Sequence, residues 1–368
     1  MLTTAIFPGR YVQGEGALAV LGEELARFGS RAFAVMDPFA MDALRPEIEA
    51  GLGQAIALTA ERFGAECSDE EIARLAGNAA GAEVVVGVGG GKALDTAKAV
   101  AHSLGRPVAI VPTIASTDAP CSALSVIYTT EGAFKRYLVL PQNPALVLVD
   151  TGVVARAPVR FLVAGMGDAL STWFEAEDCR VKRGTNMTGR LGPMTAYALA
   201  RLCYDTLLQY GVLAKAACAQ QVVTPALEHI VEANTLLSGL GFESGGLAAA
   251  HAIHNGLTVL PETHDYWHGE KVAIGTLALL MLADRPPALI DEVFGFCEQV
   301  GLPTTLAAIG LAGVEDAALM QAAERACAEG ETIWNTPHEV SPRRVLAALR
   351  AVDAEGTRRA KALPLAAE

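Results

Sequence analysis

Two patterns of hydrophobic residues follow one another along the chain. In the first part, short aliphatic runs alternate with amphipathic stretches, which is typical of strands alternating with helices. After about Pro158 such runs become scarce, and long alanine- and leucine-rich helical patterns take over, for example at 195–208 and 272–284. The strands predicted in the first part are 33–37, 84–88, 108–111 and 146–150.

These patterns predict two domains. Residues 1–158 should form an α/β domain with a doubly wound parallel sheet of the Rossmann-like kind, and residues 159–368 an all-helical domain. The boundary is expected near 156–160. A chain of 368 residues, of which 52% are hydrophobic, is long enough to bury two sizeable cores.

A run of glycines joins the predicted strand at 84–88 to a helical pattern. The three glycines at 89–91 precede Lys92, so backbone N–H groups and the positive end of a helix would face a phosphate or pyrophosphate. The ATP-binding P-loop pattern fails at Val86 and Ala93, where it requires a glycine and a hydroxyl residue. The segment therefore predicts a nucleotide loop of another kind.

Polar residues follow two other predicted strands. Asp37 ends the first, where dinucleotide sites place a carboxylate on the adenosine ribose; it would repel a 2′-phosphate and so favours NAD over NADP. Asp118 follows the strand at 108–111 and could hold a substrate hydroxyl or orient a proton relay. Hydroxyl groups near it could bind the cofactor or cap local turns, and they belong to Thr113, Ser116, Thr117 and Ser122.

Four of the seven histidines fall in one short stretch: His251, His254, His264 and His268. His251 and His254 share one face of a helix, and imidazole is the commonest protein ligand of transition metals. His264 lies in a polar loop where an exposed histidine needs no role. The cluster predicts a metal site, and the glycines at 241–246 and at 269 suggest that backbone closely approaches a bound group.

A metal held by two histidines commonly takes a carboxylate as its third ligand. Asp168 is the best candidate, because it is the one acid in the apolar, glycine-containing segment 163–173, at the start of a predicted helix. The alternative is that Asp168 is only the N-cap of that helix.

Taken together, these segments resemble the glycerol dehydrogenase branch of the iron-containing (type III) alcohol dehydrogenase superfamily, which shares its architecture with dehydroquinate synthase. The resemblance covers nearly the whole chain and is most specific at 89–98, 112–120 and 241–246. It implies one metal ion per subunit, and the ligands it implies are Asp168, His251 and His268. Iron-binding members carry a histidine one turn after the aspartate, where this chain has Thr172, and three ligands with an open position suit zinc.

The resemblance also implies how the other candidate residues act. Asp118 and Phe242 would face the substrate, and His254 corresponds to a histidine near the nicotinamide that is not a ligand; Asp118 and His254 are the candidates for the proton relay. The NAD contacts that it implies are Asp37, Gly91, Lys92, Asp95, Thr113, Ser122, Leu124 and Tyr128. The glycine and hydroxyl loops add Gly89, Gly90, Ser116 and Thr117.

The activity implied is NAD-dependent oxidation of glycerol, or a related vicinal diol, to dihydroxyacetone by hydride transfer from a zinc-bound alkoxide. The reaction centre is expected in the cleft between the domains. One alternative is a dehydrogenase for another small polyol. The other is a dehydroquinate synthase-like lyase, whose phosphate- and carboxylate-bearing substrate would need several cations, whereas the segments flanking His251 offer mainly Lys271.

Composition and charge limit the kinds of partner and the cellular compartment that we expect for this chain. The net charge of −13 argues against nucleic acid, and a small-molecule polyol is the expected partner. The apolar run at 272–283 is too short to span a bilayer, and residues 1–11 contain Pro8 and Gly9 where a signal peptide would be apolar. Seven cysteines without a C-x-x-C pair fit reduced thiols. We therefore expect a cytoplasmic enzyme, and the resemblance implies a homo-oligomer.

Overall fold

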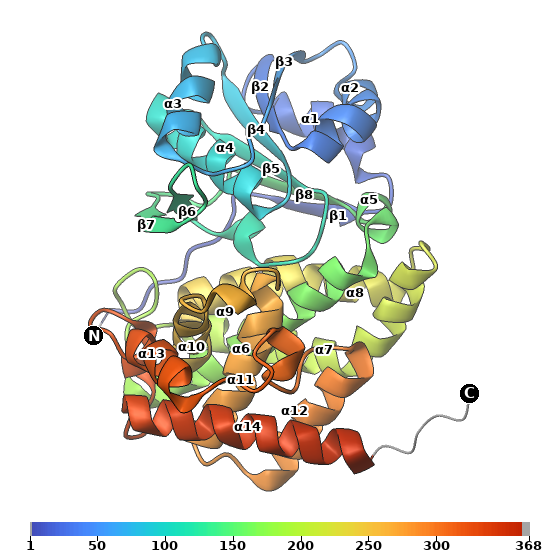
Figure 1. Ribbon diagram of the computed structural model, residues 1–368. Coiled ribbons are helices and arrows are strands. Elements are labelled where there is room, and N and C mark those ends of the chain that lie inside the picture. The colour runs from blue at the N-terminus through green and yellow to red at the C-terminus, as the bar shows by residue number, and fades with distance from the viewer. Residues whose placement is uncertain (1, 363–368) are drawn as a thin grey trace. The chain divides into compact units, whose positions relative to one another are not determined.

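The computed structural model describes residues 2–362, which divide into two compact units (Figure 1). The sheet unit comprises residues 6–162 and 213–239, and the helical unit comprises 2–5, 163–212 and 240–362. The division at Leu162 lies near the boundary expected at 156–160. Residues 213–239 return to the sheet unit, an arrangement that a single boundary along the chain does not describe.

The sheet unit is built on six parallel strands in the order β1-β8-β5-β4-β2-β3. The four predicted strands are confirmed, as is the doubly wound arrangement. An antiparallel pair, β6 and β7, forms a second, small sheet. The strands are β1 (Tyr11–Gly14), β2 (Arg31–Met36), β3 (Ala57–Arg62), β4 (Val84–Gly89), β5 (Val108–Pro112), β6 (Leu124–Tyr128), β7 (Phe134–Val139) and β8 (Leu146–Asp150).

Helices cover both faces of the large sheet (Figure 1). On one face, Met36, Val86 and Leu148 join the core beneath α1 and α2. On the other face, Gly87 makes room for α4, since a Cβ at this position would lie 2.7 Å from the Cβ of Ala97. The helices of this unit are α1 (Leu21–Leu25), α2 (Arg45–Leu52), α3 (Asp69–Asn78), α4 (Gly91–Leu104), α5 (Thr151–Arg156) and α8 (Pro225–Glu232).

The strand order reverses between β2 and β4, because the chain passes from β2 to the edge strand β3 and then returns to the far side of β2. Ligands of open α/β sheets bind outside the carboxyl ends of the strands at such a switch point. Residue 37 follows β2 and the glycines 89–91 follow β4, so the topology brings both to this edge of the sheet.

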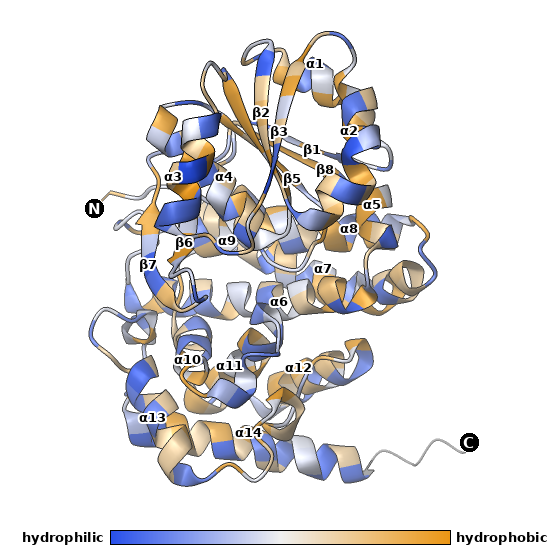
Figure 2. Cartoon of the chain, turned by 45° about the horizontal axis from the view of Figure 1, so that its top comes forward, coloured by the Kyte–Doolittle hydropathy of each residue, from blue (hydrophilic) through white to orange (hydrophobic). Residues whose placement is uncertain are grey.

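In residues 163–362 the only β-type pairing is an isolated bridge between Leu191 and Thr3, and helices make up the rest of the regular structure. Figure 2 shows how hydrophobic residues are distributed over these helices. None of the helices within residues 2–362 combines the length and hydropathy needed to cross a membrane. The helices are α6 (Val159–Lys182), α7 (Met194–Ala219), α9 (Ser238–Gly245), α10 (Ala249–Leu257), α11 (His268–Leu282), α12 (Pro287–Val300), α13 (Asp316–Ala326) and α14 (Pro342–Ala362).

The central helix of this unit is α11, which is buried almost throughout from Val272 to Leu280. A helix that is apolar on all sides is expected in the middle of a large core. The helix predicted at 195–208 is confirmed as part of α7, and the one predicted at 272–284 is confirmed as part of α11, which ends at Leu282.

Candidate active site

The glycine loop and Asp37 lie in direct contact at the switch point. Gly89 has φ +142°, and a Cβ there would lie 2.5 Å from the Asp37 carboxylate, so only glycine fits. The carboxylate accepts hydrogen bonds from the backbone N–H groups of Gly90 (3.1 Å) and Ala40 (2.8 Å). Helix α4 begins at Gly91 after Gly90, an N-cap with no side chain to bind the first N–H groups. Its positive end is therefore suited to an anion.

The hydroxyl-rich segment after β5 packs against this glycine loop. The backbone N–H of Thr113 donates to the carbonyl of Gly89 at 3.1 Å. Thr117 lies beside Gly91, its Oγ1 3.9 Å from a Cβ built there. Ser116 and Ser122 are buried in the same segment. The structure thus gathers the predicted nucleotide-binding loops of the sheet unit at one edge.

Lys92 is engaged by neighbouring side chains. Its Nζ lies 2.6 and 2.7 Å from the two carboxylate oxygens of Glu66 and 5.0 Å from the ring centre of Tyr128. Burial raises the pKa of the Tyr128 hydroxyl, and the charge of Asp95 adds to the shift. Lys92 and Tyr128, both predicted to contact the cofactor, therefore lie side by side, whereas Glu66 was not among the predicted residues.

A buried lysine that the sequence analysis missed braces the loop after Asp118. The Lys98 ammonium group donates to the carbonyls of Ala119 (2.9 Å) and Leu124 (2.5 Å) and pairs with Asp95 (2.9 Å). The Asp95 carboxylate also accepts from the backbone N–H of Val126 at 2.9 Å. Asp95 and Leu124, predicted as cofactor contacts, thus take part in holding this loop to α4.

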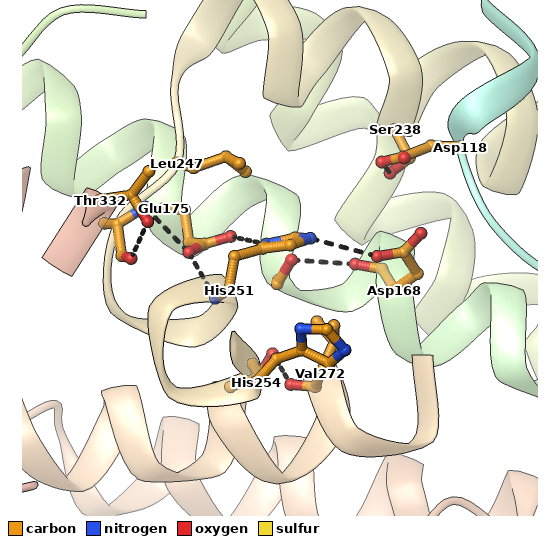
Figure 3. A network of polar contacts seen from close by, with 12 residues as sticks. Asp118, Asp168, Glu175, Ser238, Leu247, His251, His254, Val272 and Thr332 are labelled. Atoms are coloured by element: carbon orange, nitrogen blue, oxygen red, sulfur yellow. Dashed lines mark hydrogen bonds and ion pairs between the residues drawn. The ribbon is translucent and has the colours of Figure 1, made fainter. Parts of the chain in front are cut away.

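Asp118 is itself buried within the sheet unit. Its Oδ2 accepts a hydrogen bond of 2.7 Å from the Ser238 hydroxyl (Figure 3). Ser238 was not predicted, because a single serine in a helical stretch carries no signal of its own.

Three predicted metal ligands come together in the helical unit. The Oδ1 atom of Asp168, on α6, lies 3.4 Å from Nε2 of His251, on α10, and 3.2 Å from Nε2 of His268, the first residue of α11. In residues 2–362 this is the one group of three or more His, Cys, Asp or Glu side chains whose donor atoms approach within 4.8 Å of one another. Asp168 lies in the interior of α6, so the N-cap alternative is wrong.

The spacing of these donor atoms suits a small divalent cation. Zinc bonds of 2.0–2.2 Å arranged tetrahedrally place neighbouring ligand atoms about 3.3 Å apart. The Nε2–Oδ1 distances of 3.4 and 3.2 Å match that edge. Two imidazoles and one carboxylate are also a donor set that leaves a position open for chemistry.

Both histidines have their Nδ1 atoms occupied, which leaves Nε2 to face Asp168. Nδ1 of His251 lies 2.6 Å from Oε2 of Glu175, a buried residue on α6 (Figure 3). Nδ1 of His268 lies 3.0 Å from Nε2 of His254, whose own Nδ1 lies 3.1 Å from the Asn255 amide oxygen.

The direction of the hydrogen bonds in the series from His268 through His254 to Asn255 follows from its last member, Asn255. The Asn255 amide N–H donates to Glu331 at 3.0 Å, so its oxygen faces His254 and accepts from Nδ1–H. His254 Nε2 then accepts from His268 Nδ1–H, which gives His268 a lone pair on Nε2, the tautomer that can bind a metal.

The pKa shifts agree with these contacts. Burial opposes charge on Asp168, but the His268 and His251 rings hold its pKa well below the usual value. Burial would lower the pKa of His251, yet the carboxylates of Glu175 and Asp168 raise it well above the usual value. Burial, with the charge of His268, lowers the pKa of His254. The place of His251 between the carboxylates of Glu175 and Asp168 therefore favours positive charge. His254 stays neutral, so its Nε2 can accept a hydrogen bond from His268.

The glycines near the histidines serve another purpose than the one expected. A Cβ on Gly269 would lie 1.7 Å from the carbonyl oxygen of Ala164, and one on Gly167 would lie 2.4 Å from the carbonyl of Gly269. A Cβ on Gly241 would likewise lie 2.3 Å from the Thr172 methyl group. These glycines let helices approach one another, so the expectation that Gly241 and Gly269 admit a bound group is wrong.

Three further predicted residues occupy defined places. His264 stays outside the cluster, with Nε2 3.0 Å from the carbonyl of Thr258. Phe242 is buried on α9. The Lys271 ammonium group donates to the carbonyls of Thr263 (3.1 Å) and Tyr266 (2.9 Å). Lys271, the main cation that the lyase alternative could use for an anionic substrate, is thus engaged by backbone.

Comparison with known proteins assigns the chain to a class. A family model described as iron-containing alcohol dehydrogenase matches residues 8–151. A relative from Thermotoga maritima is 66% identical over 360 residues, which make up 98% of this chain and 99% of the relative. A relative from Escherichia coli O6:H1 is 53% identical and covers 95% of this chain and 96% of its own length. The chain belongs to the iron-containing alcohol dehydrogenase family.

Both of these relatives are named glycerol dehydrogenase. The crystal structure of glycerol dehydrogenase from Schizosaccharomyces pombe has the same fold, with a TM-score of 0.95 and 38% identity over 100% of this chain and 94% of that one. The resemblance to this branch of the family is confirmed.

Proposed function

We propose that the chain oxidises glycerol and related vicinal diols to the corresponding ketone, dihydroxyacetone in the case of glycerol, with NAD as hydride acceptor. The observation that carries the proposal is the group formed by Asp168, His251 and His268, whose donor atoms have the spacing of a metal site. High identity to glycerol dehydrogenases over nearly the full chain supports glycerol as the substrate.

In the helical unit, Asp168, His251 and His268 would hold one zinc ion per subunit. Zinc bound there would acidify a substrate hydroxyl, as it lowers the pKa of bound water from 15.7 to about 7. His254, neutral and 3.0 Å from His268, is the proposed proton-relay residue of this unit. Phe242 would line the substrate site.

In the sheet unit, the N-terminus of α4 would bind the NAD pyrophosphate through the backbone of 89–91, and Asp37 would bind the adenosine ribose hydroxyls. Asp118 is the proposed partner of a substrate hydroxyl and of its departing proton. In the overall reaction, the carbinol C–H delivers hydride to NAD and the O–H proton leaves to water, which gives ketone, NADH and one proton.

The proposal is tested by the initial rate of NADH formation from glycerol and NAD. Zinc-replete protein should turn over, protein stripped by a chelator should not, and returning zinc should restore the rate. Protein refilled with iron or manganese in parallel identifies the active metal. Zinc-replete protein that forms no NADH from glycerol would refute the proposed activity. Light scattering on the same sample tests the homo-oligomer that we infer from the family.

Replacing Asp37 by serine should shift cofactor preference toward NADP. Serine removes the negative charge that would repel a 2′-phosphate, and it still offers one hydroxyl to the ribose. We expect kcat/KM for NADP to rise about tenfold and that for NAD to fall several-fold, a combined change of about 2 kcal/mol by the factor of ten per 1.36 kcal/mol. Steady-state kinetics with both cofactors measure the shift, and an unchanged ratio would remove Asp37 from the ribose site.

A further inference from the structure

Glu175 is a buried carboxylate that the ligand set does not include. It lies on α6 seven residues, or about two helical turns, after Asp168, so both side chains leave the same face of one helix. Oε1 accepts hydrogen bonds from the backbone N–H groups of Ala248 (2.8 Å) and His251 (3.0 Å), and Oε2 lies 2.6 Å from Nδ1 of His251.

One oxygen of Glu175 caps the helix that carries His251. Helix α10 begins at Ala249, and its N-cap residue, Ala248, has a methyl side chain that cannot accept a hydrogen bond. The Oε1 atom therefore does for α10 what a serine or aspartate N-cap usually does, from a different helix. A carboxylate is also favourable at the positive end of a helix.

The other oxygen determines which nitrogen of His251 carries the proton. A carboxylate can only accept, so Nδ1–H donates to Oε2, and Nε2 is the nitrogen whose lone pair is available to a metal. Nε2 is the atom that faces Asp168, 3.4 Å away. The same side chain thus fixes the place of the α10 N-terminus, the rotation of the imidazole ring and its tautomer.

We propose that Glu175 is a positioning residue of the metal centre, which holds His251 in the orientation and tautomer that bind the ion. This inference rests on the proposed zinc site. In other metal sites, removing a partner of this kind lowers the metal affinity by about 10–100-fold.

Glu175→Gln tests the proposal with little change in shape. The amide oxygen can still accept from the two backbone N–H groups, while the amide N–H₂ then faces Nδ1 and donates to it. That hydrogen bond stabilises the tautomer with a proton on Nε2, which cannot bind a metal. We expect zinc affinity, measured by competition with a chromophoric chelator, to fall 10–100-fold, while the thermal midpoint of the metal-free protein changes little.

Glu177→Gln is the matched control, because it makes the same chemical change two residues along α6. Glu177 pairs with Arg285 at 2.7 Å and does not contact the histidines through any interaction in the described chain. Its zinc affinity should stay within about twofold of the unchanged protein. In the cobalt-substituted proteins, Glu175→Gln should alter the visible absorption of the ion and Glu177→Gln should not.

Glu175→Asp is a second probe, in case the glutamine variant does not fold. It keeps the charge but withdraws the carboxylate by one methylene, and zinc affinity should again fall at least tenfold. Wild-type affinity in whichever variant folds would overturn the role of Glu175. Failure of the unchanged protein to bind zinc or oxidise glycerol would instead refute the proposed function, so the two failures are distinguishable.

Discussion

Replacing Asp168 by asparagine is expected to abolish tight zinc binding and to lower kcat/KM for glycerol by about three orders of magnitude or more. Asp168 supplies the oxygen that both imidazole nitrogens approach, and its negative charge is the one that a divalent cation would neutralise directly. Loss of a metal that supplies several kcal/mol to the transition state corresponds to a rate loss of this size.

The control for this change is Asp178→Asn on the same helix. Asp178 is also buried, but it pairs with Arg285 at 2.6 Å. Its removal should leave zinc affinity and kcat within a few-fold. Circular dichroism establishes that both variants fold, and zinc titration with NADH formation gives the two readouts. An Asp168→Asn protein that kept zinc affinity and turnover within tenfold would exclude Asp168 as a ligand.

Adding one methyl group at Gly269 should lower both the stability of the protein and its zinc affinity, although Gly269 itself takes no part in the chemistry. The methyl of Gly269→Ala would lie 1.7 Å from the carbonyl oxygen of Ala164 and 2.9 Å from the backbone nitrogen of Asp168. Because both atoms belong to backbone, α6 and α11 must move apart. That shift would separate His268 from Asp168. We expect the free energy of unfolding to fall by about 3 kcal/mol and zinc affinity to fall at least tenfold.

Gly295→Ala, in the interior of α12, is the matched control. The nearest atoms to a Cβ there belong to two flexible side chains, 3.8 and 4.0 Å away. Alanine should therefore be neutral or stabilise the protein by up to about 1 kcal/mol, because it favours helix over glycine. Urea unfolding of the metal-free proteins separates the stability effect from zinc binding. If Gly269→Ala were as stable as Gly295→Ala, the close helix crossing would be wrong.

The central strands were predictable because their burial is evident from their own residues. Strands β4, β5 and β8 are buried on both faces, so nearly every residue is aliphatic, and such runs are conspicuous. The edge strand β3 was missed, because Ala57–Arg62 is partly exposed and mixes polar with apolar residues. The hairpin of β6 and β7 was missed for the same reason, since most of β7 is exposed.

Some residues of the site could likewise be predicted from the sequence, and others could not. Histidines are rare, so their clustering at 251–268 indicated a metal, and the family resemblance favoured Asp168 as a ligand over Asp168 as an N-cap. Glu175 gave no such signal, because acids are frequent in helices and its partner, Nδ1 of His251, is 76 residues away along the chain. Lys98 was hidden likewise, since only the folded chain shows that this lysine is buried under three carbonyl groups.

The glycines illustrate a prediction with the right residues and the wrong cause. Gly241 and Gly269 were taken as signs that backbone approaches a ligand, but each instead admits a neighbouring helix. A sequence shows that a side chain is absent, whereas it does not show what fills the space. Gly89 differs, because its positive φ and its contact with Asp37 lie in the loop that we predict to bind the nucleotide.

The seven-residue interval between Asp168 and Glu175 makes the length of this segment matter more than its composition. Each residue inserted into a helix turns everything beyond it by about 100° relative to what came before. A one-residue insertion or deletion between these two carboxylates would aim one of them away from His251, even if every original side chain were kept. Substitutions at 169–174 that preserve packing should be tolerated. Members of this family are therefore expected to differ in the residues of this segment but not in their number.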